Sequence, residues 1–332
     1  MNLQNRILCM GQLREYMLGD TGDWTNAKTM AEQKNPWFTQ EFIEKSVSEI
    51  ANSFLNTHQL EEWTSKYDIP DERENAKNIG IVMAGNIPMV GFHDMLCAFI
   101  SGHNATIKVS SKDDILIPAL IRFLHINFPE TESKIRIAEQ LKGCDAYIAT
   151  GGNQAATHFE YYFSKYPSII RKNRTSVAIL SGSESEEDLS KLSDDVHLYF
   201  GLGCRNVTKI YVPHGYDFIN LIQAFNKYGH FIEHHRYKNN YDYQLSLLLL
   251  NNKPYMSSEG TLLTEESSIF SPLGMLYYEF YDNKEQLTAQ LKTKPEIQCI
   301  VGKGEIGLGE AQSPGLSDYA DGVDTMAFLC GL

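Results

Sequence analysis

Apolar residues along the chain gather in short runs that are separated by longer stretches of mixed polarity. The short runs predict buried strands at residues 79–84, 105–109, 146–149 and 176–180. The stretches between them predict helices at about 89–100, 114–127 and 153–165. Because strands that alternate with helices form a parallel sheet covered on both faces, we expect a doubly wound α/β domain.

Two further patterns lie on either side of this alternation. Before it, Asn35 and Pro36 are typical of a helix cap and a first helical turn, and apolar residues then recur at helical spacing, which predicts an N-terminal helical region. After it, a charged stretch follows Ser181, and a strand at 207–212 and a helix near 217–228 begin a second alternation. We therefore expect two domains, residues 1–185 and residues 186–332.

Small residues follow several of the predicted strands. Gly85-Asn86, Gly151-Gly152-Asn153 and Ser181-Gly182 each come directly after an apolar run. Ligands of doubly wound sheets bind beyond the carboxyl ends of the strands. These turns are therefore candidate ligand-binding positions.

Composition narrows the class of protein. The 332 residues are 42% apolar, enough for a substantial core, and the net charge of −13 argues against nucleic acid or an anionic membrane surface as the main partner. Six cysteines are scattered without a Cys-x-x-Cys pair, the chain starts with no long apolar signal region, and no apolar run approaches the ~20 residues of a membrane span. We expect a cytoplasmic enzyme with no membrane-spanning segment.

Cys204 is the main candidate for chemistry. It follows Gly201-Leu202-Gly203 and precedes the predicted strand at 207–212, so the flexible glycines can present its sulfur at the entrance of a strand. A thiolate in such a position is a good nucleophile toward carbonyl carbons. A buried structural cysteine is the alternative, and for an arbitrary cysteine it is the more common case.

Five segments in a fixed order favour the nucleophile. GLGCRNVTKIYVP at 201–213 resembles the cysteine segment of the aldehyde dehydrogenase superfamily, and four other segments resemble further turns of that superfamily: MAGNIP at 83–88, NATIKVSSKD at 104–113, IATGG at 148–152 and SIFSP at 268–272. Within the superfamily, FGLGCRNV and the closing ADGVDTMAFL at 320–329 are similar to the acyl-CoA reductase family that includes the fatty-acid reductase of bacterial bioluminescence. The likeness covers most of the chain from residue 78 onward.

This resemblance implies an aldehyde-dehydrogenase-like α/β fold with a dinucleotide-binding domain and a catalytic cysteine domain. It implies that Cys204 attacks an acyl thioester and that Asn86, with the backbone N–H of Cys204, stabilises the oxyanion. It assigns cofactor contacts to Lys108, Ser110, Ser111, Thr150, Gly151, Gly152 and Phe270. Read by itself, Asn86 is equally well a turn residue before Pro88, and Lys108 an ordinary strand-edge lysine.

The choice of cofactor depends on a difference from the superfamily. Ser111 and Lys112 stand where members that prefer NAD commonly carry a glutamate that binds the ribose 2′-hydroxyl. Without that carboxylate a 2′-phosphate is accepted, so the resemblance favours NADPH over NADH. Ser268 stands where many relatives have a ribose-binding glutamate. This replacement weakens the binding expected for the nicotinamide ribose.

A second difference concerns the fate of the acyl group. Aldehyde-oxidising members use a glutamate in a Glu-Leu-Gly-Gly context to activate water, and the segment taken to match it here is Ile179-Leu180-Ser181-Gly182. Without a base, the thioester on Cys204 exchanges with a thiol rather than with water. The expected function is therefore the reduction of an acyl-CoA or acyl-protein thioester, long-chain on the resemblance alone, to an aldehyde.

Two alternatives remain open: NAD(P)-dependent oxidation of an aldehyde, with a base such as Glu184 or Glu186, and a catalytically silent binding subunit. No metal is expected, because the cluster of His230, Glu233, His234 and His235 lacks the spacing of a zinc helix. The run Gly302-x-Gly304-x-x-Gly307 is not read as a dinucleotide fingerprint, since glycines and a proline follow where a helix is required. The superfamily resemblance also implies a homodimer or another homo-oligomer.

Overall fold

A computed structural model describes all residues, 1–332, which form two compact units. Unit 1 comprises residues 1–173 and 314–332, and unit 2 comprises residues 174–313. The expected division after residue 185 differs from this arrangement in two respects. Strand β6 (Thr175–Ile179) already belongs to unit 2, and the C-terminal segment returns to unit 1, where Met326 and Leu329 join the core.

Unit 1 is built on a five-stranded sheet with the order β3-β2-β1-β4-β5, in which all neighbouring strands are parallel. The strands are β1 (Asn78–Val82), β2 (Asn104–Lys108), β3 (Ile135–Ile137), β4 (Ala146–Thr150) and β5 (Ser168–Arg171). The chain runs outward from β1 to β3 and then crosses to β4 on the other side of β1. This reversal between β1 and β4 creates the crevice at which doubly wound sheets bind ligands.

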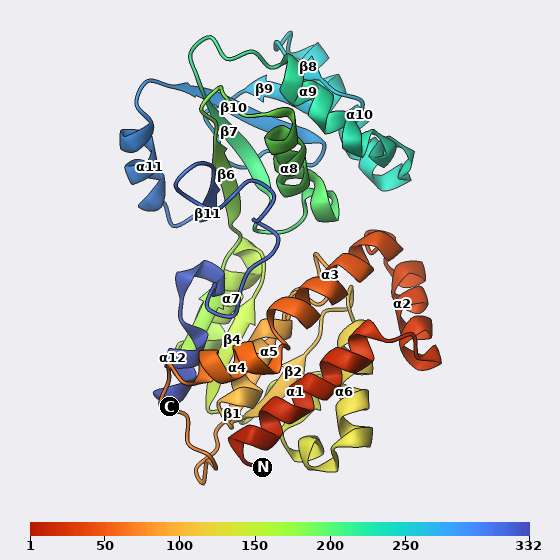
Figure 1. The fold of residues 1–332 in the computed structure, drawn as a ribbon, viewed down its shortest axis with the longest axis vertical. Helices are drawn as coiled ribbons and strands as arrows, with labels where there is room; N and C mark the ends of the chain where they lie inside the picture. Colours follow the sequence, from red (N-terminus) through yellow and green to blue (C-terminus); the bar gives the residue numbers. More distant parts are fainter. The chain divides into compact units, whose positions relative to one another are not determined.

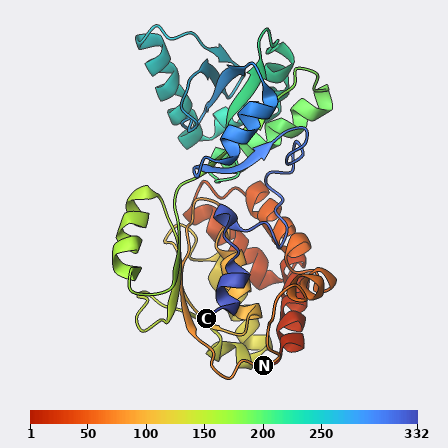
Figure 2. The same cartoon turned by 90° about the vertical axis from the view of Figure 1, so that its left-hand side faces the viewer.

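Helices cover both faces of this sheet. Helices α5 (Phe92–Ile100) and α6 (Leu116–Asn127) make the connections on one face, and α7 (Asn153–Phe163) lies on the other (Figure 2). The N-terminal helices pack onto the α5 and α6 face through α1. They are α1 (Leu3–Leu18), α2 (Gly22–Lys34), α3 (Gln40–Ser53) and α4 (Thr57–Thr64). The C-terminal helix α12 (Thr325–Cys330) packs against α5 (Figure 1).

The predicted helical N-terminal region is confirmed, but one helix starts later than expected. Helix α3 begins at Gln40, because the Thr39 side chain accepts a hydrogen bond from the Phe42 N–H and so acts as the cap. Asn35 instead ends α2.

Unit 2 contains a six-stranded sheet with the order β11-β6-β7-β10-β9-β8, parallel except for the short edge strand β8. Beside β6, its strands are β7 (Val207–Pro213), β8 (Met256–Ser257), β9 (Leu262–Glu265), β10 (Met275–Tyr281) and β11 (Ile297–Val301). Helix α8 (Glu186–His197) and helix α11 (Lys284–Lys292) lie on opposite faces (Figure 1). The remaining helices are α9 (Ile219–Phe225) and α10 (His235–Leu250).

The apolar run 245–250 forms the end of α10. Leu248 is buried there, whereas Leu249 and Leu250 are exposed. No helix of the chain combines the length and the apolar character needed to cross a bilayer.

Candidate functional site

Cys204 lies on a strained loop between α8 and β7. The chain leaves α8 through a short 3-10 turn, Leu198–Gly201, and reaches β7 at Val207; we call residues 198–206 the cysteine arch. Tyr199, Phe200 and Gly201 have φ angles of 57°, 56° and 74°, so three successive residues are left-handed. Such a conformation costs roughly 1–2 kcal/mol for each non-glycine residue and is concentrated at functional sites. The half-buried Cys204 is thus presented by a segment whose strain the surrounding contacts must offset.

Two polar side chains that the sequence analysis missed contact this arch. The Ser176 hydroxyl, on β6, donates to the Cys204 carbonyl at 3.1 Å and lies 2.9 Å from the Cys299 sulfur. Asn206 is fully buried and hydrogen bonds to both ends of the arch. The only sequence signal for either residue is a polar side chain at the edge of an apolar strand.

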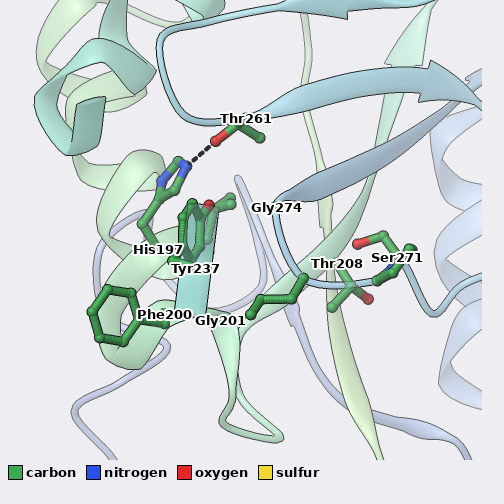
Figure 3. Close-up of a pocket in the computed structure, with 11 residues that line it drawn as sticks. His197, Phe200, Gly201, Thr208, Tyr237, Thr261, Ser271 and Gly274 are labelled. Carbon is green, nitrogen blue, oxygen red and sulfur yellow. Dashed lines mark hydrogen bonds between the residues drawn. The ribbon is translucent and has the colours of Figure 1, made fainter. Parts of the chain in front are cut away.

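A small cavity of about 30 Å³ lies beside the arch in unit 2 (Figure 3). His197, Phe200 and Gly201 line it, together with Thr208, Tyr237, Thr261 and the 271–274 turn. The His197 Nδ1–H donates to the Ser193 carbonyl at 2.7 Å, so Nε2 accepts from the Thr261 hydroxyl at 2.7 Å. Burial lowers the pKa of His197 to about 4. The imidazole is therefore neutral and serves as a structural contact, not as an acid.

Phe270, assigned to the cofactor, lies in a turn at the same edge of the unit 2 sheet as Cys204. At the start of β7, Thr208 Oγ1 donates to the Ile269 carbonyl at 2.5 Å and Lys209 Nζ donates to the Ser267 carbonyl at 2.9 Å. Because the cysteine arch leads directly into β7, the structure brings the arch and the Phe270 turn together around the beginning of this strand.

The positions considered for a general base, Ile179 and Glu184, lie at the opposite edge of this sheet. Ile179 pairs with Tyr211 near the carboxyl ends of β6 and β7, whereas Cys204 precedes the amino end of β7. The alignment of Ile179 with a water-activating glutamate is therefore wrong, because it placed that position at the wrong end of β6. Glu184 is also at this far edge, where its carboxylate accepts from the N–H groups of Ser181 and Gly182.

Two more titratable side chains, those of His214 and Glu186, also lie away from Cys204. His214, which follows β7, contacts Asp282 and is largely exposed. Glu186 is the first residue of α8, whose other end leads to the arch. The residues that do precede β6, at 168–174, read SIIRKNR and contain no carboxylate.

In unit 1, the assigned side chains gather at the carboxyl edge of the sheet. Asn86 follows β1, Lys108 ends β2, and Thr150 ends β4, and these three strands are neighbours in the order β2-β1-β4. Ser110 and Ser111 extend from β2, and Gly151 and Gly152 lead into α7. The structure therefore groups all seven of the predicted unit 1 positions around the crevice between β1 and β4.

A glycine makes this crevice compact. A Cβ at Gly85 would lie 2.6 Å from the Ser110 hydroxyl and 3.1 Å from the Lys112 Cβ, so only glycine lets the β1 and β2 turns approach so closely. Gly152, in contrast, has open space where a side chain would project. Its backbone is accessible at the start of α7, where an anion is favoured by the helix dipole.

A buried carboxyl group, Asp113, braces the turn that carries Asn86. Its Oδ2 accepts from the Met89 N–H at 2.6 Å, and the Ser46 hydroxyl donates to the Pro88 carbonyl at 2.8 Å. Met89 itself is left-handed, with φ 55°. Burial, partly offset by the Met89 hydrogen bond, raises the pKa of Asp113 to about 7. Sequence analysis did not single out Asp113, which lies 24 residues from the backbone it holds.

The donor set at this edge fits an adenine dinucleotide phosphate. Lys108 and Lys112 are exposed cations, Ser111 supplies an exposed hydroxyl, and the amino end of α7 follows the open Gly152. Cations, hydroxyls and helix N–H groups are the groups that bind phosphates and ribose hydroxyls.

Two motifs of the sequence remain, the glycine run at 302–307 and the histidine cluster at 230–235. The Gly302–Gly307 run forms a loop after β11 that is fastened to α8, because the Asp195 carboxylate accepts from the N–H groups of Gly309 and Ala311. No group of three or more His, Cys, Asp or Glu side chains is arranged to hold a metal ion, and this includes the His230 to His235 cluster.

Comparison with known proteins gives one curated relative and many solved structures. No protein-family model matches the chain. A long-chain acyl-protein thioester reductase from Aliivibrio fischeri is 23% identical over 201 residues, which is 55% of this chain and 42% of the reductase. The match thus spans less than half the length of that relative.

The solved structures that resemble this chain include several aldehyde dehydrogenases. Aldehyde dehydrogenase 21 from Physcomitrella patens is 12% identical, with a TM-score of 0.68 over 91% of this chain and 74% of that one. Lactaldehyde dehydrogenase from Escherichia coli is also 12% identical, with a TM-score of 0.63 over 87% and 71%. The expected aldehyde-dehydrogenase-like α/β fold is confirmed. The likeness to a long-chain acyl-protein thioester reductase agrees with the expected resemblance to acyl-thioester reductases.

Proposed function

We propose that this chain, which has the aldehyde dehydrogenase fold, uses NADPH to reduce an acyl thioester to an aldehyde through an acyl group held on Cys204. The observation that carries the proposal is the cysteine arch: three left-handed residues lead to a half-buried cysteine that stands at the same sheet edge as the Phe270 turn. The likeness to an acyl-protein thioester reductase supports the acyl thioester as the substrate class.

Cys204 is the nucleophile of the proposed reaction. Its thiolate attacks the thioester carbonyl, a new carbon–sulfur bond forms, and the bond to the leaving thiol breaks, so the acyl group moves from one sulfur to another. The Asn86 side-chain amide and the Cys204 N–H are proposed to stabilise the tetrahedral oxyanion, and such a donor is typically worth ~3–4 kcal/mol.

The carboxyl edge of the unit 1 sheet is proposed to hold the cofactor. Lys108, Ser110 and Ser111 would bind the adenosine ribose, with Lys112 beside the 2′-phosphate. The Thr150-Gly151-Gly152 turn would approach the pyrophosphate and nicotinamide, and Phe270 would face the nicotinamide ribose. When bound there, NADPH would supply a hydride, which would be needed to release the acyl group of Cys204 as an aldehyde and to return the sulfur as a thiolate.

Reduction is favoured over aldehyde oxidation because the candidate bases are badly placed. Glu184 lies at the carboxyl ends of β6 and β7, and Glu186 begins α8, whereas Cys204 lies at the other end of these elements. The segment that leads into β6 has no carboxylate. An acyl group on Cys204 is therefore expected to leave by hydride transfer or by exchange with a thiol, and only slowly by hydrolysis.

The test is to incubate the protein with acyl-CoA of graded chain length and then to locate the acyl group by mass spectrometry. We expect an adduct on Cys204, consumption of NADPH and release of an aldehyde. Cys204→Ala should abolish all three, whereas Cys330→Ala, which removes a half-buried thiol of unit 1, should leave them unchanged. Full turnover by Cys204→Ala would refute the proposal, and free acid formed from an aldehyde without added thiol would show oxidation instead.

A further inference from the structure

We propose that Asn206 is a positioning residue for Cys204, whose buried side-chain amide sets the conformation of the cysteine arch and thereby the direction of the Cys204 backbone N–H. This inference rests on the proposed role of Cys204 as the nucleophile. No motif discussed above assigns a role to Asn206.

The contacts of Asn206 join the two ends of the arch. Its Oδ1 accepts from the Gly203 N–H at 2.8 Å, and its own N–H donates to the Gly203 carbonyl at 3.2 Å. Its Nδ2 lies within hydrogen-bond distance of three carbonyl oxygens, those of Asp195 at 3.1 Å, Val196 at 3.3 Å and Leu198 at 2.9 Å. One side chain thus ties the residues around Cys204 to the end of α8.

These contacts supply hydrogen-bond donors for the carbonyl groups at the end of α8. The last carbonyls of a helix have no partner within the helix, and α8 ends at His197, where the chain turns sharply into the left-handed residues of the arch. The Asn206 amide donates to the carbonyls at this point and is itself 0% exposed. The left-handed turn therefore requires a donor in the place that Asn206 occupies.

Packing holds the first part of the arch, where Leu198, Tyr199 and Phe200 are buried. The Phe200 ring lies 4.5 Å from the Phe231 ring and 4.6 Å from the His234 ring, measured between centroids. The cavity of about 30 Å³ lies along the arch at Phe200 and Gly201, so packing there is incomplete (Figure 3). The Asn206 bonds to Leu198 and Gly203, and the Ser176 bond to the Cys204 carbonyl, hold the arch on either side of Phe200 and Gly201.

Two reactions of the Cys204 thiol distinguish a misdirected Cys204 N–H from a change in the accessibility of the thiol. Acylation of Cys204 builds an oxyanion that needs a correctly directed N–H, whereas alkylation by iodoacetamide builds none. A change that misdirects the Cys204 N–H should slow acylation and leave alkylation nearly unchanged. A change that buries or unfolds the cysteine should alter both.

The experiment measures both rate constants at Cys204 by mass spectrometry, with p-nitrophenyl acetate as the acyl donor. Asn206→Asp keeps the shape and the acceptor for Gly203 but loses the donor to the three carbonyls. We expect its acylation to slow by roughly tenfold or more, as for loss of an oxyanion donor. Its alkylation, which forms no oxyanion, should stay close to the wild-type rate. Thr264→Val, which removes another buried hydroxyl of unit 2, is the matched control and should change neither rate.

Equal loss of both rates, or no loss of acylation, would overturn the inference. If Asn206→Asp does not fold, Asn206→Ser, which keeps a small hydrogen-bonding group, is expected to show the same split at a smaller size. Because p-nitrophenyl acetate needs neither coenzyme A nor NADPH, a wild type that accepts this ester but no acyl-CoA would refute the proposed function and still test Asn206. A wild type whose Cys204 accepts no acyl group at all would refute both.

Discussion

Asp113 carries a carboxyl group that is almost fully buried and that accepts the Met89 N–H. Burial raises its pKa from 3.8 to about 7, so between these values the folded protein binds a proton that the unfolded chain has released. The free energy of unfolding should therefore fall as the pH rises from about 4 to about 7, by about 1.4 kcal/mol for each unit of pKa shift. Asp113→Asn removes this titrating group. Its free energy of unfolding should therefore lack this part of the pH dependence, which urea denaturation across the same pH range would measure.

Asp242→Asn is the control, since Asp242 is an exposed carboxylate of α10 paired with Lys238. Its stability should follow the wild-type slope. Parallel pH profiles for the wild type and Asp113→Asn would contradict the assignment.

The sequence predicts single residues well where chemistry is local and poorly where it depends on register or on distant contacts. The exposure of Cys204 before a strand follows from its flanking glycines. Ile179 was misplaced because an apolar run does not reveal which end of its strand faces Cys204. Asp113 accepts from backbone 24 residues away, and Asn206 donates to carbonyls up to 11 residues away across a turn, so no short sequence motif identifies either residue.

At the scale of elements, the end of α8 is joined to the turn before β9 by the hydrogen bond from Thr261 to His197. Thr261→Val leaves the buried, neutral His197 Nε2 without a donor, which typically costs about 1–3 kcal/mol. We expect a loss of that size in urea denaturation. Thr261→Ser keeps the hydroxyl and should retain most of the stability; equal losses in the two variants would show that the methyl contact matters and the hydrogen bond does not.

The elements were predicted most accurately where they are buried on both faces. β4 and β6, whose residues are almost all buried, appear as the expected apolar runs. β3, with two exposed residues out of three, gave no such run. β8 is only two residues long and was missed for the same reason. Edge strands are partly solvated, so their apolar pattern is too short to be recognised.

At the scale of the whole molecule, the division into units was predicted least well. The return of residues 314–332 to unit 1 depends on contacts between segments that are more than 200 residues apart in the sequence. Helix α12 meets α5, and the His103 Nε2–H donates to the Leu329 carbonyl at 2.9 Å. Nothing in the local sequence of α12 specifies these partners.

A chain of side-chain hydrogen bonds fastens this C-terminal segment to α4. The Trp63 Nε1–H donates to the Tyr319 hydroxyl at 3.0 Å, Tyr319 and Tyr67 share a hydrogen bond of 2.6 Å, and Tyr67 donates to Asp324 at 2.9 Å. Tyr319→Phe leaves the buried Trp63 N–H without an acceptor, at a cost of about 1–3 kcal/mol. Because all these groups belong to unit 1, the loss should be confined to that unit.

Hydrogen exchange measured by mass spectrometry can locate this loss. In Tyr319→Phe, amides of α4, α5 and α12 should exchange faster, while those of β6, β7 and β10 in unit 2 keep their protection. Tyr243→Phe, at an exposed position of α10, should change neither set. Faster exchange throughout both units would mean that the two unfold together, and the C-terminal segment would then stabilise the whole chain rather than unit 1 alone.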